Sequence, residues 1–152
     1  MDIYSTRYPN PDWPSDSGVY CWDVLDLAGR AEVVFRAVEI HSRWRQGITL
    51  DLSVKGRFQL DGGPWRGQGI DIWFDEQGET HTLEIEPQAP GILLIRNGWL
   101  QEEYGVAVEV FSGTDLSGMR IVDETPAKRT YHCNGEGGED FSIFVFSLEV
   151  LG

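Results

Sequence analysis

Residues 70–86 combine carboxylates with a tryptophan in a pattern that could bind a cationic partner. Apolar and polar residues alternate on both sides of Gln77-Gly78, which is typical of two strands joined by a two-residue turn. That turn would place Asp71 opposite Glu84, and like charges directly across a strand pair are unfavourable unless something cationic binds there. A tryptophan between acids resembles a binding hot spot, although a second layer or the N-terminal arm could instead cover Trp73. We therefore predict a partner-binding face made of Asp71, Trp73, Asp75, Thr82, Glu84 and Glu86.

The charge of the whole chain agrees with a basic partner. The 152 residues include 25 Asp and Glu against 12 Lys and Arg, a formal net charge of −13. Residues 30–66 hold seven bases and four acids, whereas residues 67–152 hold four bases and sixteen acids. This excess disfavours a nucleic-acid backbone or an anionic membrane as the main partner. The uneven distribution fits two electrostatic faces of one domain, and it fits equally well a denser solubilising charge on the later strands.

Metal and catalytic signatures are weak in this sequence. His41, His81 and His132 lie about 40 to 50 residues apart, so no two of them form a local metal site. The glycine-rich segment Asn134–Asp140 offers oxygen ligands for calcium, but its spacing is not that of an EF-hand and it favours an acidic hairpin loop. The sequence contains no motif of a phosphate-binding loop, a zinc-protease helix or a nucleophile elbow. We predict no catalytic residue, metal or cofactor.

The middle of the chain concentrates arginine. Arg43-Trp44-Arg45 is followed by Arg57 and Arg66. Basic and aromatic residues together can bind single-stranded nucleic acid, but the overall negative charge opposes that. Arginine also suits planar ion pairs, so we expect these side chains to pair with the acidic strands of the same chain.

Three hypotheses about function follow. The first is a non-enzymatic acidic binding protein of the inhibitor, immunity or neutralising type, which engages a basic protein partner. The second is a carbohydrate-binding β-sandwich module that uses Trp73, Trp99 or Trp65 as a stacking platform. In one version of this hypothesis the module also binds calcium at residues 134–140. The third is a hydrolase with paired carboxylates, for which the sequence names no pair. We favour the first.

The sequence also indicates a compartment. Residues 1–5 lack the basic and apolar regions of a signal peptide, and no run of 18 apolar residues occurs. Cys21 and Cys133 are far apart and outside any CxxC motif, which is typical of a reduced cytoplasmic protein. A long-range disulfide between them remains open.

The elements that must position these residues are strands. Residues 1–18 contain three prolines and predict an irregular N-terminal arm, whereas 19–152 predict a single β-rich domain. Residues 19–27 alternate as a strand, with Asp23 as the exception on the apolar side. Residues 31–45 are ambiguous, because they alternate like a strand but also carry acids and arginines at helical spacing. We favour a strand through about His41.

Later segments complete the expected pattern. Even-numbered apolar positions from Ile48 to Leu60 predict one long strand that is kinked or bulged at Gly56 rather than a hairpin. Residues 92–95 predict a buried strand, and Asn97-Gly98 a hairpin turn. Residues 105–111, 119–122, 127–133 and 141–150 predict further strands, the last apolar on both faces. We predict a mainly β fold: a single-domain antiparallel β-sandwich or barrel, with at most one helix at about residues 30–45.

Overall fold

Alternating apolar residues close this chain into a barrel-like antiparallel sheet, as the sequence predicts. The structure is a computed structural model that describes residues 6–103, 105–111, 116–135 and 137–151. The strands are β1 (Tyr8–Pro9), β2 (Tyr20–Leu27), β3 (Ala31–Ile40), β4 (Arg45–Leu52), β5 (Gly56–Leu60), β6 (Trp65–Arg66), β7 (Gly69–Phe74), β8 (Thr80–Pro87), β9 (Gly91–Glu103), β10 (Val106–Phe111), β11 (Met119–Val122), β12 (Lys128–Cys133) and β13 (Phe144–Val150). None of the described residues forms a helix, so the strand interpretation of residues 31–40 is confirmed.

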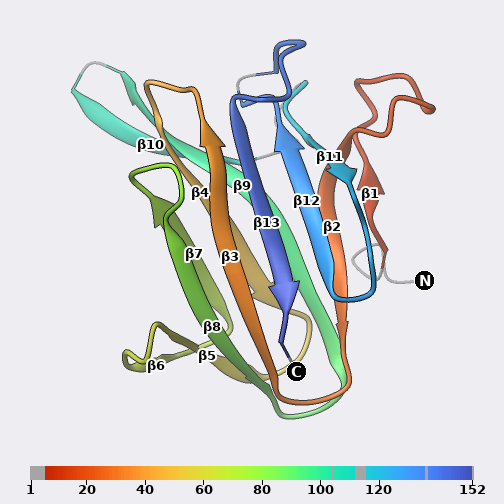
Figure 1. The fold of residues 1–152 in the computed structure, drawn as a ribbon, viewed down its shortest axis with the longest axis vertical. Coiled ribbons are helices and arrows are strands. Elements are labelled where there is room, and N and C mark those ends of the chain that lie inside the picture. The colour runs from red at the N-terminus through yellow and green to blue at the C-terminus, as the bar shows by residue number, and fades with distance from the viewer. Residues whose placement is uncertain (1–5, 104, 112–115, 136, 152) are drawn as a thin grey trace.

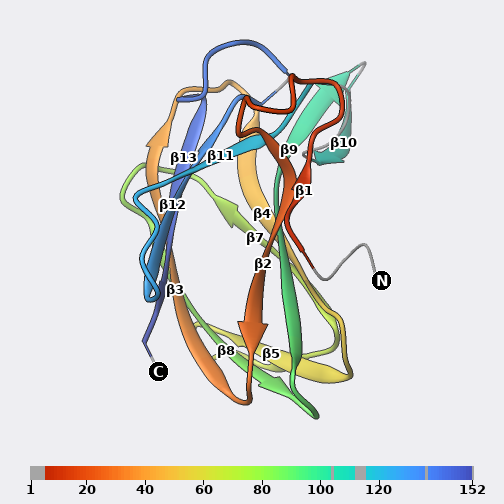
Figure 2. The same ribbon diagram turned by 90° about the vertical axis from the view of Figure 1, so that its right-hand side faces the viewer.

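The sheet follows one continuous path, β6-β5-β8-β3-β13-β12-β11-β2-β9-β4-β7, to which β1 adds at β2 and β10 at β9. Figures 1 and 2 show it folded into two layers, with β3, β13 and β12 in one and β2, β9 and β4 in the other. The layers join where β11 meets β2, at the single pair Met119 and Tyr20. The sheet is nearly closed, because β5, the strand next to the end of the path at β6, contacts β7 at the other end.

The core lies between the two layers, and strand alternation builds it. Inward residues of β3 and β13, such as Phe35 and Phe146, are fully buried against inward residues of β4 and β9, such as Leu50 and Ile95. β13 lies between β3 and β12, in the interior position that its two apolar faces predict. Within the described ranges we find no helix long and apolar enough to cross a membrane.

The predicted hairpin of residues 70–86 is wrong. β7 pairs with β4, where Ile72 lies opposite Ile48, and β8 pairs with β3 and β5. Both strands bury the expected residues, but they belong to opposite layers, and the connection between them crosses from one layer to the other. Alternation specifies which face is buried and leaves the partner open, since any two inward-facing strands have matching parity.

Two further expectations need correction. The region 48–60 is two strands in different layers, β4 and β5, although its even-numbered parity is kept through Phe58. Asn97-Gly98 is no turn, because β9 runs through it, and the chain reverses instead between Glu103 and Val106. A side chain on Gly98 would lie 3.0 Å from the Val110 carbonyl, so this glycine permits close approach of β10 rather than a turn.

Candidate functional site

The six residues of the predicted partner-binding face lie in two separate groups. Asp71, Trp73 and Asp75 lie on or directly after β7, whereas Thr82, Glu84 and Glu86 lie on β8 in the other layer. Because β7 and β8 do not pair, these six residues do not form the single face that the predicted hairpin would have made. Each group has its own neighbours.

On β8, the carboxylates are paired with arginines of the middle segment. Arg30 Nη2 donates to Glu84 Oε2 at 2.5 Å, and Arg57 Nη2 donates to Glu86 Oε1 at 3.2 Å. Arg57 also lies 4.2 Å from the ring centroid of Trp65. The Arg57 contact agrees with the expectation that this arginine pairs within the chain, and both ion pairs leave this group partly neutralised.

On β7, the two ends of the group differ. Arg45 donates to Asp75 Oδ1 at 2.7 Å and lies 6.0 Å from the ring centroid of Trp73. Asp71 accepts from the Thr49 hydroxyl at 2.9 Å, which supplies no positive charge. A shallow groove of about 430 Å³ beside Asp71 is lined by Trp73 and Asp51, among others.

A carboxyl group that the sequence did not single out lies against Asp71. Glu109 is on β10, and burial, followed by the hydrogen bond with Asp71 and its charge, raises the pKa of Glu109 to about 7. Burial and the charge of Asp71 likewise raise the pKa of Asp51, against the opposing charge of Arg96. Carboxyls in contact hold a proton between them because both cannot ionise at low cost. Local alternation carries no signal for such a contact between distant strands.

β10 itself is an exposed edge strand. Among the described residues it pairs with β9 alone, and Figure 1 shows the β9–β10 hairpin projecting past the body of the sheet. Val106 is 60% exposed and Val108 is 50% exposed, and the opposite face carries the exposed Glu109. An exposed apolar edge offers free main-chain groups to another strand.

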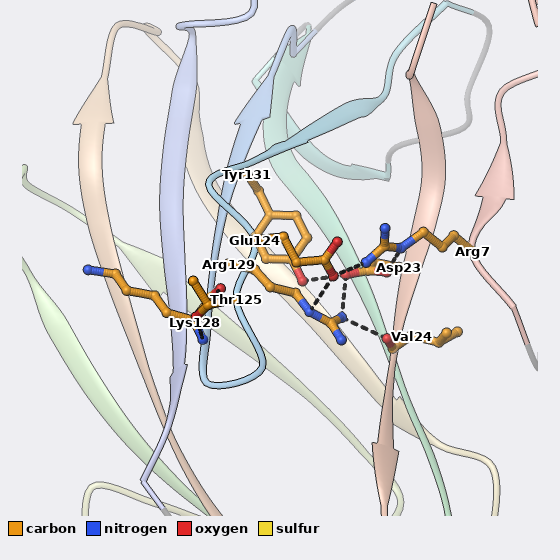
Figure 3. Close-up of polar contacts among 8 residues, drawn as sticks. All are labelled: Arg7, Asp23, Val24, Glu124, Thr125, Lys128, Arg129 and Tyr131. Atoms are coloured by element: carbon orange, nitrogen blue, oxygen red, sulfur yellow. Dashed lines mark hydrogen bonds and ion pairs between the residues drawn. The ribbon is translucent and has the colours of Figure 1, made fainter. Parts of the chain in front are cut away.

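The most buried charge in the described chain is Asp23, the exception in the β2 pattern, which is fully buried. Arg7 Nε donates to its Oδ1 at 2.8 Å, while Arg129 Nη1 and the Tyr131 hydroxyl donate to its Oδ2 at 2.7 Å and 2.5 Å (Figure 3). Arg129 Nη1 also donates to the Val24 carbonyl at 2.7 Å. Burial, followed by the charge of Asp23, raises the pKa of Tyr131 well above its ordinary value.

Glu124 completes this Asp23 cluster at the surface. It accepts a hydrogen bond from Arg7 and forms an ion pair with Arg129, whose Nε lies 3.1 Å from Glu124 Oε2. The turn that carries it is closed by Lys128 N, which donates to Thr125 Oγ1 at 3.0 Å (Figure 3). Both oxygens of the buried Asp23 carboxylate are therefore occupied, and the cluster joins β2 to β12. We interpret it as structural.

The remaining candidates have structural partners as well. His81 Nδ1 lies 2.5 Å from Asp61 Oδ2 and its Nε2 lies 2.6 Å from Glu79 Oε2. In the loop 134–140, Asn134 Oδ1 accepts from Gly118 N at 2.8 Å, so this oxygen holds the loop to the body. No metal-ligating group of three acidic, histidine or cysteine side chains occurs in the part of the chain that the structure describes. Cys21 and Cys133 are buried free thiols.

The fold and its surface define a class: an acidic, all-β, barrel-like protein with an exposed edge strand that carries valines and one glutamate. Comparison with protein-family models, curated proteins and solved structures gives no significant match.

Proposed function

We propose that this chain is a non-enzymatic acidic binding protein that engages a basic protein partner, in the manner of an inhibitor, immunity or neutralising protein. The net charge of −13 supports the proposal because opposite charge accelerates association and disfavours acidic competitors. The single observation that carries it is the exposed edge of β10, with valines on one face and Glu109 on the other.

The binding mode that fits this edge is strand addition. A basic segment that pairs with β10 would use its main-chain groups, cover Val106 and Val108, and bring a Lys or Arg side chain to Glu109. Many natural edge strands carry lysine against unwanted pairing. A carboxylate at this position repels a second acidic copy and attracts a basic chain.

The contact between Asp71 and Glu109 favours the same partner. Near pH 7 the pair still holds part of one proton, because the pKa of Glu109 is raised to about 7. A guanidinium or ammonium group placed there would replace the proton and let both carboxylates ionise. We therefore keep Asp71 as a residue that contacts the basic partner, and we no longer assign that role to Thr82, Glu84 and Glu86 of β8.

The two alternatives have less support. A sugar needs an open indole face, but arginines lie near the rings of Trp65 and Trp73, and Trp99 is only 3% exposed. Glycosidases hold their carboxyls about 5 Å or more apart, whereas Asp71 and Glu109 are directly hydrogen-bonded. The proposal includes a cytoplasmic location, which the two free buried thiols support.

Site-specific photo-crosslinking in the cells that express the protein tests this proposal. A photoreactive amino acid at Val108 should yield a crosslinked basic protein, and the same group at Leu151, which is 53% exposed, should not. Equal products from the two positions, or a product that contains only this chain, would contradict it. With the captured partner, Asp71→Lys should slow association and flatten its salt dependence, whereas Glu84→Lys on β8 should change neither.

A further inference from the structure

A pocket of about 370 Å³ opens at one end of the barrel, and its lining residue Trp99 pairs with Val110 of β10. It is bounded by the β3–β4 and β12–β13 connections, which meet at the upper end in Figure 1, and by Trp99 of β9. Nothing in the proposed function uses this pocket. Its walls combine two tryptophans and an amide with two carboxylates, an arginine and a histidine: Trp44, Trp99, Gln46, Glu139, Asp140, Arg43 and His41.

The amide in this pocket has an unused acceptor. Gln46 is 1% exposed, and its Nε2 donates to the Trp44 carbonyl at 3.1 Å. Its Oε1 is buried and has no hydrogen-bond partner among the described residues. A buried carbonyl oxygen without a donor is unfavourable, so a ligand that brings an N–H group to Gln46 would relieve that cost.

The aromatic wall already holds a cation. The Arg43 guanidinium lies 4.5 Å from the ring centroid of Trp44, within the range of a cation–π contact. This contact covers an indole face that a sugar ring would need. It also shows which chemistry the wall accepts, namely a positive group on an aliphatic stem.

The acidic rim is ordered by its own hydrogen bonds. Asp140 Oδ1 accepts from Ser142 N at 2.9 Å and from Ser142 Oγ at 2.6 Å, and these bonds lower the pKa of Asp140. Asn134 Nδ2 donates to the Gly138 carbonyl at 2.9 Å, which holds the residue before Glu139 in place. The negative charge at the mouth is therefore in place before a ligand binds, which reduces the entropy cost of binding.

We propose that this pocket binds an organic cation, a guanidinium or primary ammonium group on an aliphatic stem. The stem lies along the Trp44 side of the pocket, the charge faces Glu139 and Asp140, and one N–H donates to Gln46 Oε1. The cation can be a free amine or the arginine or lysine side chain of another protein. A free amine would bind whether or not β10 has a partner, so this inference and the proposed function can fail separately.

Calorimetric titration of the full chain tests the inference. We expect n-butylguanidinium and n-butylammonium to bind at millimolar concentration, and n-butanol and methyl glucoside to bind at least roughly tenfold more weakly, because they lack the charge. A peptide with one central arginine, compared with its citrulline analogue, distinguishes a protein side chain from a free amine. Tighter binding of the arginine peptide assigns the protein source, and equal or weaker binding assigns the free amine. No binding of either cation, or equal binding of the neutral probes, overturns the proposal.

Substitutions locate the site. Gln46→Leu should weaken binding of the cation by roughly tenfold, and Gln46→Glu should strengthen it, because the new carboxylate meets the charge directly. If Gln46→Leu fails to fold, the exposed loop pair Glu139→Gln with Asp140→Asn still tests the rim and should weaken binding severalfold. Glu149→Gln removes an exposed acid on β13 outside the pocket lining and should leave binding unchanged. Equal losses in Glu149→Gln and the loop pair would show a general charge effect and overturn the assignment.

Discussion

The Tyr131 hydroxyl donates to Asp23 Oδ2 at 2.5 Å, across 108 positions of the chain. Asp23 lies on β2 and Tyr131 on β12, the two strands on either side of β11. Because β11 pairs with β2 at one residue, few main-chain hydrogen bonds join the two layers where these strands meet. The Asp23 cluster replaces them with side-chain contacts.

We predict that Asp23→Asn destabilises the protein by about 3–5 kcal/mol, since it removes the buried carboxylate that pairs with Arg7 and Arg129 and leaves them only the surface carboxylate of Glu124. Tyr131→Phe removes only one hydrogen bond to a charged group and should cost about 2 kcal/mol. Urea unfolding of the two variants and the wild type measures both values. A loss below about 1 kcal/mol in Asp23→Asn would contradict the structural role of the cluster.

His81 should make stability depend on pH. Burial lowers the pKa of His81, but the hydrogen bonds and charges of Asp61 and Glu79 outweigh it and raise the pKa above 6.5. The protonated form is therefore favoured in the folded state. This stabilisation is complete below about pH 6.5 and is lost as the pH rises through the folded-state pKa. Urea midpoints measured across this range should fall for the wild type and change less for His81→Gln.

The Asp71–Glu109 pair should titrate near neutrality. Carboxyl-carbon NMR should show Glu109 changing charge at about pH 7, and Asp71→Asn should move that midpoint down towards 4.5. The sign for stability follows from the raised pKa: the contribution is largest at low pH and is lost between about 4.5 and about 7. A midpoint near 4.5 in the wild type would remove the argument that a cation is favoured at this pair.

Gly47 permits the close packing of β4 on Trp73. A side chain there would place its Cβ 2.5 Å from Trp73 Cε3 and 2.7 Å from the Ile72 carbonyl oxygen. Gly47→Ala should therefore cost about 1–3 kcal/mol and shift the tryptophan fluorescence. Gly67→Ala is the matched control, because a Cβ at Gly67 meets nothing within 4 Å. Equal stability of the two variants would count against this contact.

The cysteines should be chemically silent in the folded protein. Cys133 is fully buried, and burial raises its pKa well above the ordinary value, so its reactive thiolate is scarce. Cys21→Ser, which leaves Cys133 as the single thiol, should react with a thiol reagent only after urea is added. Fast labelling without urea would show that this part of the core opens.

The sequence predicted which residues of each strand face inward, because this depends on neighbouring residues of the same strand. Strand alternation identified the inward residues of β3, β7 and β8, because the two faces of a strand differ in their contact with water. It also marked Asp23 as a charge on an apolar side, the one available sign of the Asp23 cluster. The identity of its partners was hidden, since Arg7 and Arg129 are far from it in the chain.

The sequence by itself determined the fold class, the strand faces and the negative charge. Only the tertiary structure decided which strands pair, because every inward-facing strand satisfies the same parity. That decision separated Asp71 from Glu84, placed Glu109 against Asp71, and assembled the pocket around Gln46 from two connections and β9. A site built by long-range contacts depends on chain closure, which local periodicity does not encode.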